Sequence, residues 1–316
     1  MSTPKNSTVV RSKNAVRLAR AALQTAYVVS EDLGTSLAER LFTTPRRHRR
    51  PDRERNVLAT AREGSIDITL RAPRWHNMRV PVATWRWGVG PTVLLVHGWE
   101  GRGSQLGAFV APLVAAGMSV VTFDAPGHGN SPEHRLYLTD HADAIADVAA
   151  AVGPLHGIIA HSFGAAAALL AFTRRGTHAP RNVMVAPNVL IDDAVRRFAK
   201  MVGLDEADRI ALEQRLATQT GVGIGDLRLP NIAAQRDDAL LIYHDREDRE
   251  VSFEHASQLA ATWPNAQLVE TAGLGHRRIL REGAVLAAIV EFVRDGISLP
   301  QSDLVREVDR QLEGQP

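Results

Sequence analysis

The sequence contains no cysteine, which excludes disulfide bonds, thiolate metal sites and a cysteine nucleophile. It also has no apolar run of the ~18 residues that are needed to span a bilayer. The stretch 21–30 near the N-terminus is interrupted by Gln24, Thr25 and Tyr27, unlike the pure apolar core of a secretory signal. We therefore expect a cytoplasmic protein without stable membrane insertion.

Positive charge is concentrated near the N-terminus. The first 56 residues hold 12 lysines and arginines against 5 acidic residues, with a peak in "PRRHRRPDRER" (45–55). No aromatic residues interleave with these arginines and no nucleic-acid motif is present, so we do not expect nucleic-acid binding. We interpret this stretch as a solvated linker in which Pro45 and Pro51 block a helix; an arm for an anionic partner is the alternative.

Before this linker, small and apolar residues recur at helical spacing. They are Ala19, Ala22, Leu23, Ala26, Leu33 and Leu37. The pattern predicts an amphipathic helix that packs on the protein or on a second copy, which makes a homo-oligomer possible; a signal peptide or a membrane-surface helix is the alternative.

From residue 64 the chain alternates between strand and helix patterns. Two alternating stretches, 65–70 and 79–87, predict an antiparallel hairpin at a sheet edge. Short apolar runs typical of strands covered on both faces follow at 92–96, 119–123, 157–160, 182–186, 239–243 and 267–271. Helical patterns lie between them at 105–116, 141–152, 163–174, 253–262 and 281–294. This order predicts an α/β fold with a doubly wound, mostly parallel sheet.

The same patterns divide the chain into segments. We expect an N-terminal helix and basic linker over 1–63, an α/β core over 64–298, and a short C-terminal helical tail over 299–316. Residues 189–229 lack a strand signal and predict two helices inserted between strands. Such an insertion commonly covers the ligand site of an α/β scaffold, so we expect a helical cap.

Ser162 lies where the apolar run 157–160 turns into a helix, in "AHSFGAAAA". Ala160 and Gly164, two residues before and after, leave room for a tight turn that would present the hydroxyl at the carboxyl edge of the sheet. This is the G-x-S-x-G nucleophile-elbow pattern with alanine in the first position. A serine that merely caps the helix is the alternative.

A serine nucleophile needs a base, and the base needs a carboxylate to orient it. His276 follows the last predicted strand in the glycine-bearing loop "ETAGLGHRRIL". The stretch "ALLIYHDREDREV" ends the preceding strand and supplies four carboxylates, on Asp245, Glu247, Asp248 and Glu250. Asp124 precedes the serine in the chain, which is the wrong order, and we interpret it as a turn-stabilising residue.

Four stretches together resemble a serine hydrolase of the α/β-hydrolase fold, of the bacterial esterase and lipase type. They are "LLVHGWEGRGSQ", "FDAPGHGNSP", "AHSFGAAAA" and "LLIYHDREDREV…GLGHRRIL", and the resemblance covers about residues 65–295. It implies a Ser162–Asp248–His276 triad, because Asp248 matches the acid of the family's H-G-x-x-D-x-x-V pattern. Asp245 replaces the usual glycine of that pattern and is the second candidate.

The resemblance also implies an oxyanion hole. The amide of Phe163 follows the serine, and the amide of Trp99 would be the second donor, with Gly98 allowing a close backbone approach. We place His97, Gly98, Trp99, His161 and Phe163 in the substrate pocket, with the imidazole of His161 directed away from the nucleophile.

The expected activity is hydrolysis of small-molecule carboxylic esters or thioesters without a metal or cofactor. Aminopeptidase, amidase and carbon–carbon bond hydrolase are alternatives on the same fold. An aminopeptidase would need carboxylates for the substrate amine, for which Asp192, Asp193, Asp205 and Glu206 are candidates. A non-catalytic binding protein on a hydrolase scaffold is the alternative of another class.

Overall fold

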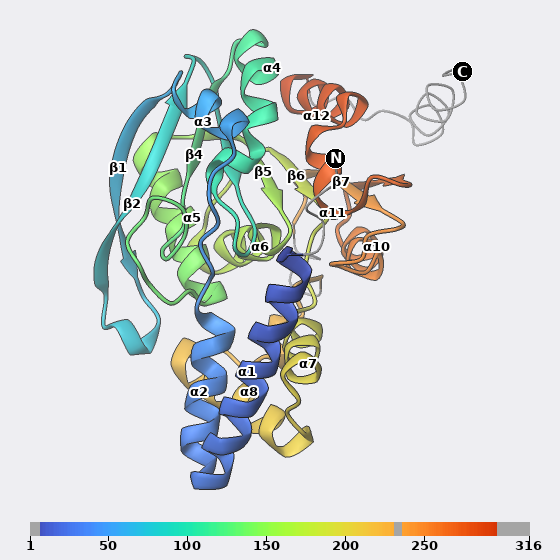
Figure 1. Cartoon of the computed structure of the whole chain (residues 1–316). Coiled ribbons are helices and arrows are strands. Elements are labelled where there is room, and N and C mark those ends of the chain that lie inside the picture. The colour runs from blue at the N-terminus through green and yellow to red at the C-terminus, as the bar shows by residue number, and fades with distance from the viewer. Residues whose placement is uncertain (1–6, 231–235, 296–316) are drawn as a thin grey trace. The chain divides into compact units, whose positions relative to one another are not determined.

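The structure is a computed structural model that describes residues 7–230 and 236–295 (Figure 1). It contains two compact units. The helical unit combines Met1–Thr44 with Leu190–Arg228, and the sheet unit combines Pro45–Val189 with Leu229–Pro316.

The sheet unit is built on one eight-stranded sheet in the order β1-β2-β4-β3-β5-β6-β7-β8. The strands are β1 (Arg62–Leu70), β2 (Met78–Trp87), β3 (Thr92–Val96), β4 (Ser119–Phe123), β5 (Leu155–His161), β6 (Arg181–Val185), β7 (Ala239–Asp245) and β8 (Ala266–Thr271). β1 and β2 form the expected antiparallel hairpin, and β2 pairs antiparallel with β4. All other pairs are parallel, so the expected α/β fold with a mostly parallel sheet is confirmed.

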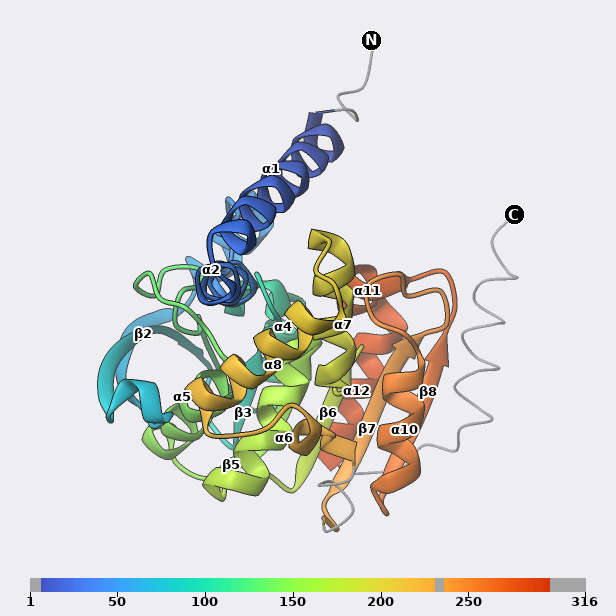
Figure 2. The same cartoon turned by 90° about the horizontal axis from the view of Figure 1, so that it is seen from below.

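Helices cover both faces of this sheet. They are α3 (Asp52–Leu58), α4 (Val110–Ala115), α5 (Leu138–Val152), α6 (Phe163–Arg175), α10 (Glu254–Thr262), α11 (Gly275–Arg278) and α12 (Gly283–Asp295). Short 3₁₀ helices are η1 (Pro73–Trp75), η2 (Gly103–Phe109) and η4 (Ile279–Arg281). Helices α5, α6 and α10 lie on one face, and α4 and α12 lie on the other (Figure 2). Because both faces are covered, β3 and β4 are buried at every residue.

Parallel strands bring four loops to one edge of the sheet. The turn after β5 starts at Ser162, and the loop after β3 starts at His97. Asp248 follows β7 and His276 follows β8. The carboxyl ends of all four strands therefore present the predicted site residues at the same edge.

The basic stretch before the sheet is irregular and mostly exposed over residues 45–51, and it is helical over Asp52–Leu58. Pro51 precedes the first turn of α3, where proline is tolerated because the first amides of a helix have no partner inside it. Arg46, Arg47 and Arg50 are bonded to loops of the sheet unit. The expectation that Pro51 blocks a helix is therefore wrong, and the irregular part of the stretch is bonded to loops of the sheet unit.

The helical unit contains α1 (Ser7–Val29), α2 (Glu31–Thr43), α7 (Ile191–Val202), α8 (Glu206–Thr220) and η3 (Gly225–Leu227). The predicted N-terminal helix is in fact two helices, because the Ser30 side chain caps α2 and starts a new direction. Leu23 and Ala26 are buried as expected, whereas Leu33 is exposed. Arg215 of α8 joins the unit by bonding to Glu39 and Asp32 of α2.

The insertion over 189–229 contains two long helices, α7 and α8, as its sequence predicts. Its role as a cap stays a prediction. The expected C-terminal tail over 299–316 lies outside the described residues. Among residues 7–230 and 236–295, no helix is both long and apolar enough to cross a membrane.

Candidate active site

Ser162 occupies a strained turn between β5 and α6. Its backbone has φ 56° and ψ −123°, a conformation that costs a non-glycine residue on the order of 1–3 kcal/mol. Two flanking bonds hold it there, from the Ser162 amide to Val185 O (3.0 Å) and from the Asn188 amide to Ser162 O (3.1 Å). The side chain makes no capping bond to α6, so the helix-capping alternative is wrong.

The small neighbours of Ser162 are required by close packing. A Cβ atom on Gly164 would lie 2.4 Å from the carbonyl oxygen of His97, which no real contact permits. Ala160 is fully buried. The first turn of α6 thus packs directly on the loop after β3.

The structure brings Ser162, His276 and Asp248 together. The Ser162 hydroxyl donates to His276 Nε2 over 3.0 Å, and His276 Nδ1–H donates to Asp248 Oδ2 over 2.7 Å. Ser162 and His276 retain 8% and 7% of their surface exposed, so the three side chains are largely shielded from water but still accessible to a small molecule. Such an arrangement can remove a proton from a serine hydroxyl.

Asp248 is held ionised by several donors. Its Oδ1 accepts hydrogen bonds from the amides of Glu250 (2.8 Å) and Val251 (3.0 Å). Burial alone would raise the pKa of this carboxyl, but bonds from His244 and His276 outweigh it and hold the pKa well below its usual range. An ionised Asp248 fixes the His276 proton on Nδ1 and leaves Nε2 free to accept.

His244 is a site residue to which the sequence analysis assigned no role. Its ring is fully buried, and Nε2–H donates to Val251 O at 3.1 Å while lying 3.4 Å from Asp248 Oδ2. The sequence signal for His244 was its place as the histidine of the H-G-x-x-D-x-x-V pattern, four residues before Asp248.

Asp245, the second acid candidate, does not contact His276. Its Oδ2 accepts from the Thr271 hydroxyl (2.8 Å) and the Leu274 amide (2.9 Å), and its Oδ1 accepts from the Glu247 amide (3.0 Å). It therefore ties the acid loop after β7 to the loop that carries His276.

His161 packs beneath His276. The two ring centroids are 4.7 Å apart, and His161 Nε2–H donates to the carbonyl oxygen of His276 over 3.0 Å. Burial, together with the nearby charge of His276, lowers the pKa of His161 to about 3, so the ring is neutral at pH 7. His161 thus positions the backbone of His276.

The two predicted oxyanion donors are free amides. Among the described residues, neither Trp99 N–H nor Phe163 N–H has a hydrogen-bond partner. Their half-buried rings meet edge to face with centroids 5.8 Å apart. Gly98, just before Trp99, approaches the elbow so closely that a Cβ atom would lie 2.9 Å from Ser162 Cβ.

Gly98→Ala is expected to displace the Trp99 amide and lower kcat for ester hydrolysis by about 10²-fold, the loss typical of one oxyanion donor. The added methyl would also lie 3.1 Å from His161 O, so the loop must move away from Ser162. Gly283→Ala is the matched control, because its Cβ would meet nothing within 4 Å. Equal kcat values for the two variants would contradict this geometry.

Two buried histidines hold the loop that carries Trp99. His97 accepts from the Ala125 amide (3.0 Å) and donates to Gly98 O (2.7 Å). His128 accepts from the Glu100 amide (3.1 Å) and donates to Pro126 O (3.0 Å). His97 is fully buried and both of its nitrogens bond to the backbone, so it supports the predicted pocket without facing it.

Asp124 stabilises the turn after β4, as expected. Its carboxylate accepts from the amides of Gly103 (2.8 Å) and Asn130 (2.7 Å). It contacts neither Ser162 nor His276 in the described structure.

His141 of α5 is fully buried between the rings of His97, Phe123 and Phe163, at centroid distances of 5.4, 6.0 and 6.0 Å. Within the described residues neither of its ring nitrogens has a hydrogen-bond partner. Burial, with smaller contributions from the neighbouring histidines, lowers its pKa well below the usual 6.5.

His141→Phe is therefore expected to make the protein more resistant to acid. The unfolded chain takes up a proton at His141 below about pH 6.5, and the folded protein does not. Through this one group, the free energy of unfolding therefore decreases by about 1.4 kcal/mol for each pH unit below that value. Phenylalanine cannot take up a proton in the unfolded chain, and the substitution breaks no hydrogen bond. Urea unfolding at pH 5 and pH 7.5 measures the difference, and equal pH slopes in both proteins would contradict the prediction.

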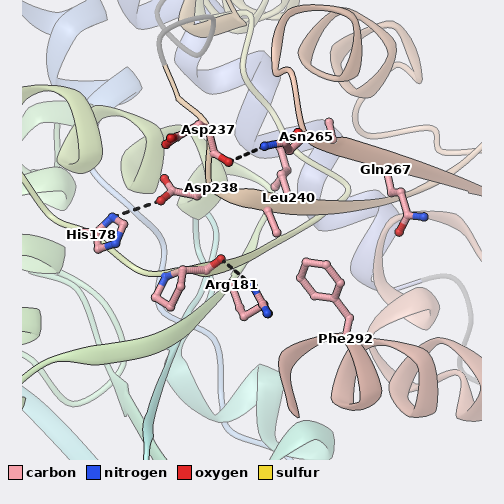
Figure 3. Close-up of a pocket in the computed structure, with 11 residues that line it drawn as sticks. His178, Arg181, Asp237, Asp238, Leu240, Asn265, Gln267 and Phe292 are labelled. Carbon is pink, nitrogen blue, oxygen red and sulfur yellow. Dashed lines mark hydrogen bonds and ion pairs between the residues drawn. The ribbon is translucent and has the colours of Figure 1, made fainter. Parts of the chain in front are cut away.

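A cavity of about 680 Å³ lies away from this site. It is lined by residues at the amino ends of β6, β7 and β8, including Arg181, Ala239 and Ala266. Figure 3 shows His178 and Asp238 facing each other in it, with His178 Nδ1 and Asp238 Oδ1 3.2 Å apart. Because Ser162 follows the carboxyl end of β5, this cavity is at the opposite edge of the sheet.

The chain is similar in sequence to known proteins. A family model described as serine aminopeptidase, S33, matches residues 89–250, about half of the chain. A pimeloyl-(acyl-carrier protein) methyl ester esterase of Aromatoleum aromaticum is 27% identical over 248 residues, covering 65% of this chain and 99% of the esterase.

Solved structures have the same fold at lower identity. Rv0554 of Mycobacterium tuberculosis superposes with a TM-score of 0.59 at 16% identity, covering 75% of this chain and all of the other. An esterase of Exiguobacterium antarcticum has a TM-score of 0.56 at 15% identity, covering 73% of this chain and 99% of the other. With its sheet order and the extent of the family match, this chain is an α/β-hydrolase and belongs to the serine aminopeptidase, S33, family.

Proposed function

We propose that the protein is a serine esterase that hydrolyses small-molecule carboxylic esters, or thioesters, through an acyl-enzyme on Ser162. The observation that carries the proposal is the continuous relay from Ser162 Oγ to His276 Nε2 (3.0 Å) and from His276 Nδ1 to Asp248 Oδ2 (2.7 Å). Ser162 is the nucleophile, His276 the general base and Asp248 the residue that orients the base. No cofactor is needed for this chemistry.

In the first half-reaction, Ser162 Oγ forms a bond to the substrate carbonyl carbon while His276 Nε2 takes the hydroxyl proton. The amides of Trp99 and Phe163 donate to the oxyanion, and the latter lies at the positive end of α6. The carbonyl carbon then loses its bond to the leaving oxygen or sulfur. His276 donates its proton to that atom, and an alcohol or thiol departs.

In the second half-reaction, a water molecule takes the place of the leaving group. It gives a proton to His276 Nε2 as its oxygen bonds to the acyl carbon. The bond from Ser162 Oγ to that carbon breaks, Oγ recovers the proton, and the carboxylic acid leaves.

Ester hydrolysis is favoured over the aminopeptidase activity after which the family is named. The four carboxylates of the insertion that are candidates to bind a substrate amine are all engaged inside the helical unit. They form Asp192–Arg196, Asp193–Arg197 and Glu206–Arg209 ion pairs, and Asp205 caps α8 through the Asp208 amide. The methyl ester esterase relative also supports an ester substrate.

A fluorophosphonate probe followed by peptide mass spectrometry tests the nucleophile. Labelling of Ser162 is expected, with turnover of p-nitrophenyl esters from acetate to decanoate measured in parallel. An acyl thioester and an aminoacyl p-nitroanilide separate the remaining classes. Faster cleavage of the anilide would favour an aminopeptidase, and absence of both labelling and turnover would favour a non-catalytic binding protein.

A further inference from the structure

The chain segment 45–58, which we call the strap, lies across the loop that carries Trp99. Three ion pairs join the strap to the loops after β3 and β4. They are Arg46–Glu100, Glu54–Arg102 and Arg50–Asp124. Two of these pairs lie on either side of Gly101 in the loop after β3. In one the strap supplies the arginine, and in the other it supplies the glutamate.

The Arg46–Glu100 pair is closest to the predicted oxyanion donor, since Glu100 directly follows Trp99. Arg46 Nε lies 2.7 Å from Glu100 Oε1, and Nη2 lies 2.9 Å from Oε2, a two-point contact that fixes the carboxylate plane. The Arg46 backbone amide adds a third bond to Oε1 at 3.3 Å. His48 Nε2 lies 3.4 Å from Oε2.

Glu100 also has an unusual backbone. Its φ of 52° is in the left-handed region, which a glutamate rarely adopts. The Glu100 amide is bonded to His128 Nε2 at 3.1 Å, while its side chain is held by Arg46. The bond to its backbone amide and the bonds to its side chain together hold Glu100 in this conformation. They therefore fix the peptide bond between Trp99 and Glu100.

The second of these two pairs, Glu54–Arg102, is a buried ion pair. Arg102 and Glu54 have side chains only 7% and 6% exposed, with Nε–Oε2 and Nη2–Oε1 distances of 2.5 and 3.0 Å. The Ser104 hydroxyl also donates to Glu54 Oε2, at 2.7 Å. Breaking a buried pair by removing one partner is strongly destabilising. The Arg46 side chain is 68% exposed, so it can be replaced without that cost to folding.

We propose that the strap positions the oxyanion hole: Arg46, through Glu100, holds the Trp99 amide in the direction needed for the transition state. This inference rests on the proposed function. Arg46 is a positioning residue, because it acts through Glu100 and touches neither substrate nor the reacting atoms.

Arg46→Gln is the direct test, with Arg49→Gln as the matched control. Arg49 is an exposed arginine of the same strap for which no bond to any described residue is found. For Arg46→Gln we expect kcat to fall about 10-fold with KM nearly unchanged, a fraction of the loss of a whole oxyanion donor. Affinity for an arylboronic acid, which mimics the tetrahedral intermediate, should fall by the same factor, and Arg46→Lys should be intermediate.

A second measurement does not depend on chemistry. In the Ser162→Ala background, amide hydrogen exchange of the peptide covering 97–105 should be faster in Arg46→Gln than in Arg49→Gln. Equal exchange and equal kcat in the two variants would overturn the proposal. The proposal would also be overturned if Arg46→Gln lowered kcat and raised KM by the same factor while amide hydrogen exchange of the peptide stayed unchanged.

The two proposals fail in different ways. If the wild-type protein shows no ester hydrolysis that depends on Ser162, the proposed function fails. The exchange comparison then still decides whether Arg46 restrains the loop.

Discussion

Ser162→Ala is expected to lower kcat for p-nitrophenyl ester hydrolysis by on the order of 10⁶-fold, because the proposed nucleophilic oxygen is removed. The residual rate should reflect substrate binding and the oxyanion amides. The variant loses one hydrogen bond, to His276 Nε2, so its melting temperature should change by only a few degrees. Steady-state kinetics and thermal unfolding of the same preparation measure both effects.

Ser65→Ala is the matched control, since Ser65 is an exposed serine on β1 and far from the relay in the fold. It should retain wild-type kcat and full phosphonate labelling. Saturable turnover by Ser162→Ala at a rate comparable with that of Ser65→Ala would remove Ser162 as the nucleophile.

Asp248→Asn has the second largest expected effect, a fall in kcat of about 10⁴-fold. The asparagine amide would donate to His276 Nδ1, which places the imidazole proton on Nε2. Nε2 can then no longer accept the proton of Ser162. The substitution keeps the shape of the side chain, so the loss should appear in kcat and much less in the melting temperature.

Asp245→Asn separates this electrostatic effect from the structural role of the same loop. The side chains of Asp245 and Asp248 are both fully buried, but Asp245 accepts bonds from Thr271 and Leu274 instead of His276. We expect Asp245→Asn to lower the melting temperature and to reduce kcat by less than about 10-fold. If the two variants exchange these phenotypes, the acid of the relay is Asp245.

Local patterns predicted most of the sheet unit. The strand patterns at 92–96 and 119–123 match β3 and β4 residue for residue, because a strand covered on both faces is a short unbroken apolar run. The pattern 163–174 differs from α6 by one residue, since Gly176 in the left-handed conformation ends the helix. The pattern 105–116 was less accurate: it is a 3₁₀ helix, η2, followed by α4.

Side-chain partners were harder to predict, and the strap shows why. Arg46 and Glu100 are 54 residues apart, and nothing local in "PRRHRRPDRER" distinguishes Arg46, which is paired, from Arg49, which has no partner among the described residues. The same holds for His244, whose contact with Asp248 depends on how the turn after β7 closes.

The sequence by itself determined the alternation of strands and helices, the tight turn at Ser162, and the chain order of serine, acid and histidine. These depend on short-range periodicity and on the space that small residues leave at a turn. Only the tertiary structure decided that Asp248 and not Asp245 meets His276, and that the basic stretch binds the Trp99 loop. Those contacts join segments far apart in the chain, so they exist only once the sheet has placed its loops at a common edge.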